Sequence, residues 1–327
     1  MRTSRRSTRR YVAVAVMAVV ALPVCAAAAP AGKVRHFELK GDENRPYSIV
    51  SGPDGNLWFT ESDGNAIGRI APDGAVRRFT LGTPGSEPYG IAVGPDGNLW
   101  FTERLANRIG VMNTAGRVVA EYDLPTVNAQ PWDITLGADG ALWFTEENVD
   151  QLGRMTADGS VTEYPLTSDT FPTGIAAGPS GTVWFTEEIG NAVGRIKTRK
   201  PDPLASLELF SVPTDQSLPW DITRGPDDAM WFTELAGHNI GRIDERGTIT
   251  EFPVPGDSGI AGITTGPDSR LWFTQNDIAR VGSIATTGSL GKAYDTRPYP
   301  FGIAAGPDGA IWFCEGYGNA IGRIAVH

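Results

Sequence analysis

Cysteine and histidine are both scarce in this sequence of 327 residues, which contains two cysteines and three histidines. Cys25 lies in an N-terminal segment of the kind that is removed on export, so Cys314 is left alone and an intramolecular disulfide is excluded. These residues show no spacing typical of a zinc site. No Ser-His-Asp set, phosphate-binding glycine loop or dinucleotide fingerprint stands out. The sequence therefore lacks the motifs by which several large enzyme classes are detected.

Long apolar runs are also missing, apart from Val12–Val24, which is too short to span a bilayer comfortably. This run follows five arginines and precedes the alanines 26–29, which is the order of an export signal. We therefore predict a signal peptide at residues 1–29, a single domain at 30–327 and a periplasmic or secreted protein without a membrane span. Removal of the signal changes the formal charge from −10 to −15, which excludes nucleic acid as a favoured partner.

Glycine and proline, in contrast, are abundant, with 40 and 24 residues, and they belong to a repeated motif. The stretch GPDGNLWFTE at residues 52–61 recurs six more times in degenerate form. The tryptophans of the seven copies are 40 to 47 residues apart, at Trp58, Trp100, Trp143, Trp184, Trp231, Trp272 and Trp312. A period in the low forties indicates a repeat architecture.

Each copy has the pattern of four short strands. In the first copy these are the apolar or alternating runs 46–50, 57–60, 66–70 and 76–81, separated by loops and by Asp-Gly turns. Glycine and proline interrupt every run that could form a helix, which excludes a helical repeat. Four antiparallel strands per repeat of this length are typical of a propeller blade. We therefore predict an all-β fold, a seven-bladed β-propeller of four-stranded blades.

The two ends of the chain complement each other. The last copy stops after its third strand, at 321–325, whereas the segment 34–39 before the first copy is similar to the fourth strands at 162–166 and 250–254. We expect residues 34–39 to complete the last blade, which closes the ring and removes an open sheet edge. The longest spacing is explained by an outer loop at residues 198–203 of the fourth copy.

One loop of each copy leads into the first strand, and in five copies its Pro-x motif has an aromatic x. These residues either pack near the axis or line a channel mouth that binds a ligand with an apolar or cyclic body. Two of them are followed by carboxylates. We predict a small-molecule site on a monomeric protein, formed by Tyr47, Tyr89, Trp132, Asp133, Trp220, Asp221 and Phe301.

A second loop begins with an acidic or amide residue in every copy: Glu61, Glu103, Glu146, Glu187, Glu234, Gln275 and Glu315. Two interpretations are open. Each glutamate bonds within its own loop or to the arginine of a nearby Gly-Arg-Ile motif, or the glutamates face the axis and bind a cation. For the second case we name Glu103 and Glu315 as candidate ligands of Mg²⁺ or Ca²⁺. On the same face, His238 is either a solvated loop residue or a candidate base.

The motif Gly-Pro-Asp-Gly-x-Leu-Trp-Phe-Thr-Glu, together with Asn-x-Ile-Gly-Arg-Ile, resembles the virginiamycin B lyase (streptogramin lyase) family over residues 34–327. The resemblance implies a seven-bladed propeller. It also implies, for the true lyases, a magnesium-assisted elimination that opens a cyclic depsipeptide antibiotic. In that reaction a histidine takes the α proton and the metal stabilises the developing enolate.

The same resemblance places the catalytic histidine of the family at Phe301 and a metal-binding glutamate at Tyr299. A substrate-contacting histidine corresponds to Ala261, and Glu315 is close to another metal-binding glutamate. Phenylalanine cannot accept a proton, and tyrosine is a poor magnesium ligand at neutral pH. Genuine streptogramin lyase activity is therefore not expected from these residues.

Three hypotheses follow for the function. The first is an exported propeller that binds or senses a small ligand at its aromatic and acidic mouth. The second is an enzyme of the lyase or lactonase kind with a rearranged, metal-dependent site, in which His238 would be the base. The third is a scaffold that binds other proteins through its rims. Bound metal with turnover favours the second, and a partner retained by a mouth variant favours the third.

Overall fold

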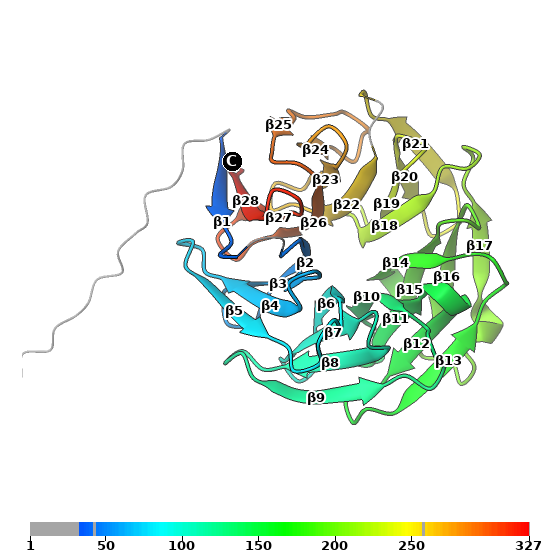
Figure 1. The fold of residues 1–327 in the computed structure, drawn as a ribbon. Helices are drawn as coiled ribbons and strands as arrows, with labels where there is room; N and C mark the ends of the chain where they lie inside the picture. Colours follow the sequence, from blue (N-terminus) through cyan, green and yellow to red (C-terminus); the bar gives the residue numbers. More distant parts are fainter. Residues whose placement is uncertain (1–32, 42–43, 257–258, 327) are drawn as a thin grey trace, which may run out of the picture.

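In the computed structural model, residues 33–41, 44–256 and 259–326 are described, and the predicted signal peptide lies outside these ranges. Seven four-stranded antiparallel sheets form a ring around a central channel (Figure 1). In each blade the first strand lies nearest the axis and the fourth lies at the outer edge. The predicted seven-bladed propeller is confirmed.

The strands follow one another regularly along the chain. Blades 1 and 2 contain β2 (Pro46–Ser51), β3 (Leu57–Glu61), β4 (Ala66–Ile70), β5 (Val76–Thr80), β6 (Pro88–Val93), β7 (Leu99–Glu103), β8 (Arg108–Met112) and β9 (Val118–Asp123). Blades 3 and 4 contain β10 (Pro131–Leu136), β11 (Leu142–Glu146), β12 (Gln151–Met155), β13 (Val161–Pro165), β14 (Pro172–Ala177), β15 (Thr182–Glu187), β16 (Ala192–Lys197) and β17 (Glu208–Ser211).

Blades 5 and 6 contain β18 (Pro219–Arg224), β19 (Met230–Glu234), β20 (Asn239–Ile243), β21 (Ile249–Pro253), β22 (Ile260–Thr265), β23 (Leu271–Gln275), β24 (Arg280–Ile284) and β25 (Tyr294–Asp295). Blade 7 contains β26 (Pro300–Ala305), β27 (Ala310–Glu315), β28 (Ala320–Ala325) and β1 (Val34–Glu38). Short 3-10 helices lie at η1 (Glu147–Val149), η2 (Pro179–Gly181) and η3 (Leu204–Ser206). The last of these belongs to the outer loop between β16 and β17, where the sequence predicts the insertion of blade 4.

Blade 3 shows why the repeated motif folds in this way. Gly140 in the β10–β11 turn has a φ of 79°, a conformation that glycine adopts without strain. Gly153 of the Gly-Arg motif pairs with Phe144 on the neighbouring strand. A Cβ atom at Gly153 would lie 2.0 Å from the Phe144 ring, so only glycine allows the ring to cover the third strand.

The motif tryptophans pack between neighbouring blades. Trp143 of blade 3 is fully buried against Ile175 and Phe185 of blade 4. Its indole nitrogen donates a hydrogen bond of 3.1 Å to Asp139 Oδ1, and the other oxygen of Asp139 accepts one of 2.7 Å from Arg154 Nε. The aspartate of the turn therefore fixes the tryptophan and the arginine together.

The arginines of the Gly-Arg-Ile motif do not form ion pairs with the glutamates that end the second strands. The interpretation that paired these two sets of residues is therefore wrong. In blade 3, Arg154 pairs with Trp143 in the ladder, whereas Glu146 lies at the other end of β11. The arginines instead form ion pairs with other carboxylates, away from the strand ends that carry these glutamates: Arg69 with Asp54, Arg154 with Asp139, Arg195 with Glu208, Arg242 with Asp227 and Arg323 with Asp308.

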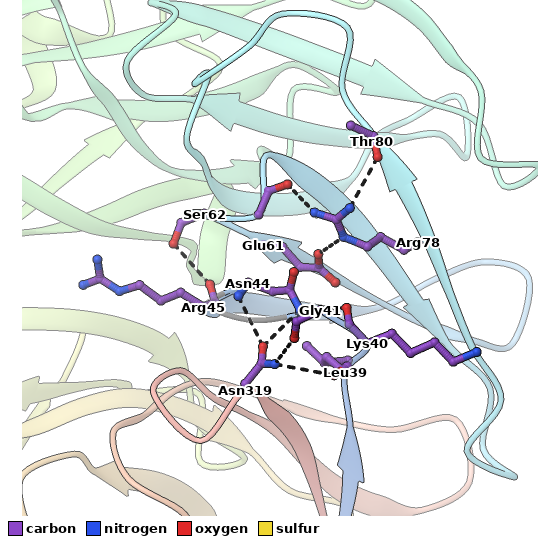
Figure 2. A network of polar contacts seen from close by, with 11 residues as sticks. Leu39, Lys40, Gly41, Asn44, Arg45, Glu61, Ser62, Arg78, Thr80 and Asn319 are labelled. Carbon is purple, nitrogen blue, oxygen red and sulfur yellow. Dashed lines mark hydrogen bonds and ion pairs between the residues drawn. The ribbon is translucent and has the colours of Figure 1, made fainter.

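The N-terminal strand closes the ring. β1 pairs antiparallel with β28, and Phe37 stacks on Trp312 with ring centroids 5.3 Å apart. Just after β1, Asn319 Nδ2 donates a hydrogen bond of 2.7 Å to the carbonyl of Gly41 and Asn44 Nδ2 donates one of 3.1 Å to Asn319 Oδ1 (Figure 2). The first and last segments of the chain are thus joined by strand pairing, ring stacking and side-chain hydrogen bonds.

Candidate ligand-binding site at the channel mouth

One face of the ring, which we call the mouth face, carries the loops that the sequence analysis selected. In blade 3 the start of the first strand, Pro131, pairs with the end of the second strand, Glu146. Because neighbouring strands are antiparallel, the loop after β11 and the connection from β13 to blade 4 lie at the same face. The tight turns β10–β11 and β12–β13 lie at the opposite face.

The five predicted aromatic residues meet across the mouth. The ring centroids of Tyr47 and Tyr89 are 3.9 Å apart, and Trp132 lies 4.5 Å from Tyr89. Phe301 lies 5.0 Å from Tyr47, and Trp220 meets Trp132 edge-on at 5.4 Å. We call these five side chains the aromatic cluster. Their mutual contacts mean that packing near the axis and lining of the mouth, which the sequence left as alternatives, occur together.

A cavity of about 70 Å³ lies in the channel beside the aromatic cluster. Its lining includes Tyr47, Trp132, Trp220 and Phe301, together with both predicted aspartates, Asp133 and Asp221. This volume holds a few water molecules and is far below the roughly 300–1,000 Å³ of a typical ligand pocket. A drug-sized ligand would therefore rest on the cluster or displace its side chains.

Asp133 and Asp221 join neighbouring blades as well as facing the cavity. Asp133 accepts a hydrogen bond of 3.0 Å from the amide of Ile175 in blade 4. Asp221 accepts one of 2.8 Å from the amide of Ile263 in blade 6. Each aspartate also accepts a hydrogen bond from the amide that follows it in the chain. The two carboxyl groups thus satisfy four backbone donors of the inner strands.

Burial raises the pKa of both aspartates, although the backbone hydrogen bonds act in the opposite direction. The pKa of Asp133 is raised to about 6. The pKa of Asp221 is raised to about 7, by burial first and then by the nearby charge of Asp133. Near neutral pH the two carboxyl groups are therefore partly protonated. They favour ligand groups that are cationic or that form hydrogen bonds.

The glutamates that end the second strands do not line the channel cavity in the described part of the chain. All are buried, with exposed fractions of 0 to 2%. Their side chains reach toward the outer strands within the blades: Glu61 pairs with Arg78 (Figure 2), and Glu315 pairs with His36 at 2.9 Å. Glu234 accepts a hydrogen bond of 3.0 Å from Asn239. These contacts correspond to the local-partner interpretation and not to a ring of charges around the axis.

Several of these glutamates have unsatisfied oxygens, including Oε1 of Glu234. Neither carboxyl oxygen of Glu103 or Glu146 has a hydrogen-bond partner among the described residues, and the same holds for Oε1 of Glu187. Burial is the main reason that the pKa of Glu103 and Glu187 is raised to about 7 and that of Glu146 to about 8. A nearby carboxylate raises each value further.

The two candidate metal ligands, Glu103 and Glu315, lie in blades 2 and 7 with blade 1 between them (Figure 1). Glu315 is engaged by His36 and also accepts a hydrogen bond of 2.8 Å from the amide of Arg297. Within the described ranges no three residues of the types His, Cys, Asp and Glu are grouped so as to hold a metal ion. The structure therefore does not bring Glu103 and Glu315 together.

The candidate base His238 lies in the β19–β20 turn, with a φ of 55°. Its amide donates a hydrogen bond of 3.1 Å to the carbonyl of Glu234, and its own carbonyl accepts one of 2.9 Å from Val254. His238 is not among the residues that line the channel cavity. It is therefore separate from the aromatic cluster and the two aspartates.

The positions that correspond to lyase residues have aromatic or small side chains. Phe301 packs against Tyr47, and its ring occupies the space that a Cβ atom on Gly316 would need. Tyr299 meets Tyr317 edge-on, with ring centroids 4.7 Å apart. Ala261 is buried in the cavity wall. None of these three side chains is an imidazole, the group that the resemblance requires as the base.

Two features of the mouth face were not predicted from the sequence. The guanidinium of Arg104 lies 5.0 Å from the ring centre of Trp132, and Glu87 and Glu147 hold it there by ion pairs. In addition, large apolar side chains are exposed on loops of this face, and they form what we call the apolar rim: Leu105, Val127, Phe171, Ile189, Tyr299 and Tyr317. Their positions outside the repeated motif explain why periodicity did not reveal them.

The fold and the mouth define a seven-bladed propeller with an aromatic, acidic channel opening. The model of the virginiamycin B lyase family matches residues 18–201 and 203–327. A solved streptogramin B lyase is 34% identical with a TM-score of 0.84, and the match covers 90% of this chain and 97% of that protein. The virginiamycin B lyase of Staphylococcus aureus is 35% identical with a TM-score of 0.83, covering 90% and 99%. This chain belongs to the virginiamycin B lyase family.

Two further solved structures are similar to this chain. A catalytically inactive histidine-to-alanine variant of the Staphylococcus aureus lyase, solved with quinupristin, is 34% identical with a TM-score of 0.83 and coverage of 90% and 99%. Hydrazine synthase of Kuenenia stuttgartiensis has a TM-score of 0.72 over 88% of this chain and 97% of that one, but at 16% identity it shares the fold alone. None of the curated protein sequences matches this chain.

Proposed function

We propose that this protein binds a small molecule with a cyclic or otherwise apolar body at the channel mouth and does not open it by elimination. The observation that carries the proposal is the continuous aromatic cluster, with Asp133 and Asp221 in the wall of the cavity beside it. Aromatic rings supply a large apolar surface, and the carboxyl groups select polar or cationic groups on the ligand. The apolar rim extends the contact area, because the cavity itself is too small for such a ligand.

Binding without elimination is supported by the residues at the lyase positions. In the Staphylococcus aureus protein, replacement of one histidine by alanine gives a catalytically inactive enzyme that was solved with quinupristin. The resemblance places that kind of base at Phe301, which is packed into the aromatic cluster. A rearranged, metal-dependent lyase or lactonase is the second candidate. Its base would be His238, which does not line the cavity.

Quinupristin is a suitable probe, because a related propeller has been solved with it. We expect a saturable change in tryptophan fluorescence on titration, and we expect mass spectrometry to find the ligand intact. The seven motif tryptophans are buried between blades, so the signal should come from Trp132 and Trp220. Changing both to phenylalanine should remove the signal and weaken binding by about tenfold or more.

A matched control is Leu209→Ser on the outer strand of blade 4, which should leave the titration unchanged because Leu209 is exposed far from the mouth. No saturable signal up to millimolar quinupristin, or a signal that persists in the double phenylalanine variant, would contradict binding at the cluster. Retention of a protein partner by the double variant would instead favour the scaffold hypothesis, with the apolar rim as the contact surface.

Export is also part of the proposal. The basic, apolar and small-residue order of residues 1–29 supports it, and no helix in the described ranges is long and apolar enough to cross a membrane. We expect N-terminal sequencing of the protein from its native host to begin close to Ala29, Pro30 or Ala31. Recovery of the intact chain from the cytoplasm would contradict this prediction.

A further inference from the structure

In several blades the buried glutamate at the end of the second strand interacts with one particular residue of the outer strand. That residue is the ladder partner of the glycine in the third strand. In blade 1 this residue is Arg78, whose guanidinium binds Glu61 (Figure 2). In blade 7 it is His36, whose Nδ1 lies 2.9 Å from Glu315. In both blades a side chain that can carry positive charge is placed on the buried carboxyl group. In these two blades the outer strand thus supplies the group that compensates the buried carboxylate.

Blade 3 has a carboxylate at this position instead. Glu163 pairs with Gly153 in the ladder, and its negative charge is near enough to Glu146 to raise the pKa of that buried carboxyl group. Glu146 is fully buried, and neither of its carboxyl oxygens has a hydrogen-bond partner in the described part of the chain. Two carboxyl groups thus share a site where blades 1 and 7 each have one carboxyl group and one basic side chain. Glu146 is fully buried and Glu163 is half-buried, so the repulsion between them is relieved either by a proton on one carboxyl group or by a bound cation.

Neutral oxygen atoms complete the surroundings of this pair. Thr126 Oγ1 lies 2.7 Å from Glu163 Oε2, and the amide of Thr126 donates to Glu163 Oε1 at 2.9 Å. The Oε1 atom of Gln151 lies 3.5 Å from Thr126 Oγ1, and Gln151 pairs with Glu146 in the ladder. Thr126, in the loop before β10, thus contacts both Glu163 and Gln151, and Gln151 is the ladder partner of Glu146, so the four residues adjoin one another.

We propose that blade 3 binds a calcium ion between Glu146 and Glu163, with Gln151 and Thr126 as neutral oxygen ligands. Two carboxylates balance the charge of a divalent cation, and calcium accepts irregular sets of six to eight oxygen ligands that include amides and waters. Magnesium requires a near-ideal octahedron of ligands, which this irregular set of oxygen atoms does not supply. The site is separate from the mouth cavity, so it does not depend on the ligand proposed there.

Other blades lack one part of this arrangement. In blade 5 the pair Glu234 and Glu251 is present, but the amide nitrogen of Asn239 donates to Glu234 where blade 3 has Gln151. In blade 4 the position opposite the glycine is Leu209, which is apolar. In blade 2 the charge of Arg108 acts on Glu103 and partly offsets its burial. Blade 3 thus offers the set with the most oxygen atoms and with the least compensation of the negative charge of its carboxyl groups.

The experiment uses the mature chain, residues 30–327, stripped of metal with a chelator and dialysed. Isothermal titration with calcium chloride should give one site per chain. Calcium at a hundredfold excess over its Kd should raise the melting temperature by about 5 °C or more, with a much smaller effect of magnesium chloride. Absence of calcium binding at millimolar concentration would overturn the proposal and leave a shared proton as the species that joins the two carboxyl groups.

Variants test the location of the site. Glu163→Arg reproduces the arrangement of Arg78 in blade 1, so it should fold and lose the calcium response; Glu163→Gln should also lose it. Glu251→Gln removes the matching glutamate of blade 5 and should keep the response. A calcium response that survives in both Glu163 variants would place the ion elsewhere and overturn the proposal. The double phenylalanine variant at the mouth should bind calcium normally, which separates this result from the proposed ligand binding.

Discussion

Deletion of residues 30–40 is expected to lower the melting temperature of the mature protein by about 10 °C or more and to promote self-association. The loss of β1 exposes the edge of β28 and removes Phe37 from Trp312. It also removes the hydrogen bond between His36 and the buried carboxyl group of Glu315, and loss of a partner by a buried polar group typically costs about 1–3 kcal/mol. Calorimetry and size-exclusion chromatography of the truncated chain provide the measurement.

Two controls separate ring closure from a general effect of truncation. A synthetic peptide of residues 33–41 should restore part of the lost stability, because an exposed edge accepts an added strand. The substitution His36→Gln keeps the strand and should cost only part of the stability lost by deletion. If the truncated chain melts within about two degrees of the parent and stays monomeric, β1 does not contribute the stability that we assign to closure.

The fold was predictable because the information is local and repeated. The tryptophan motif gives the number of blades, and the glycine and proline positions give the turns. Closure was predictable from the ends alone, since the segment before the first repeat is similar to the strand that the last repeat lacks. The structure confirms both, with β1 paired to β28 in the expected antiparallel arrangement.

The candidate site was predictable only in part. The position of the glutamates at the mouth face follows from their place at the end of the second strand, but the direction of their side chains does not follow from repetition. Glu146 is two residues from Phe144, and residues two apart on a strand share a face. Both side chains therefore lie over the third strand, within the blade, and Glu146 is kept away from the axis.

The ion-pair partners of the motif arginines could not be predicted from the sequence. Asp139 in the turn and Glu146 at the strand end are both acidic, and each could bind Arg154 as far as spacing alone shows. Ladder register decides between them, because it places Arg154 opposite Trp143, closer to the turn. The apolar rim was missed for a different reason: its residues lie in loops, where neither periodicity nor turn chemistry constrains the side chain.

Incubation with a type B streptogramin and magnesium is expected to leave the antibiotic ring intact. Loss of the general base typically reduces the rate by a factor of about 10²–10⁴, before any loss of metal assistance. Phe301 cannot take the proton, and Glu315, the nearest equivalent of a metal-binding glutamate, is already engaged by His36 and the amide of Arg297. Mass spectrometry detects elimination directly, and ready ring opening by the parent protein would overturn our assignment of the mouth as a binding site.

The combined substitutions Phe301→His and Tyr299→Glu test whether the missing histidine and glutamate are the reason that the protein does not open the antibiotic ring. The scaffold should tolerate both, because the carbonyl of Phe301, which accepts a hydrogen bond of 2.9 Å from Thr274, is unaffected and Tyr299 is 38% exposed. We expect ring opening above the level of the parent, and more so when His36→Gln frees Glu315 for a metal. Because His36 and magnesium would compete for the same carboxylate, the gain should depend on magnesium concentration. A gain independent of magnesium would show that Glu315 has no part in the restored chemistry.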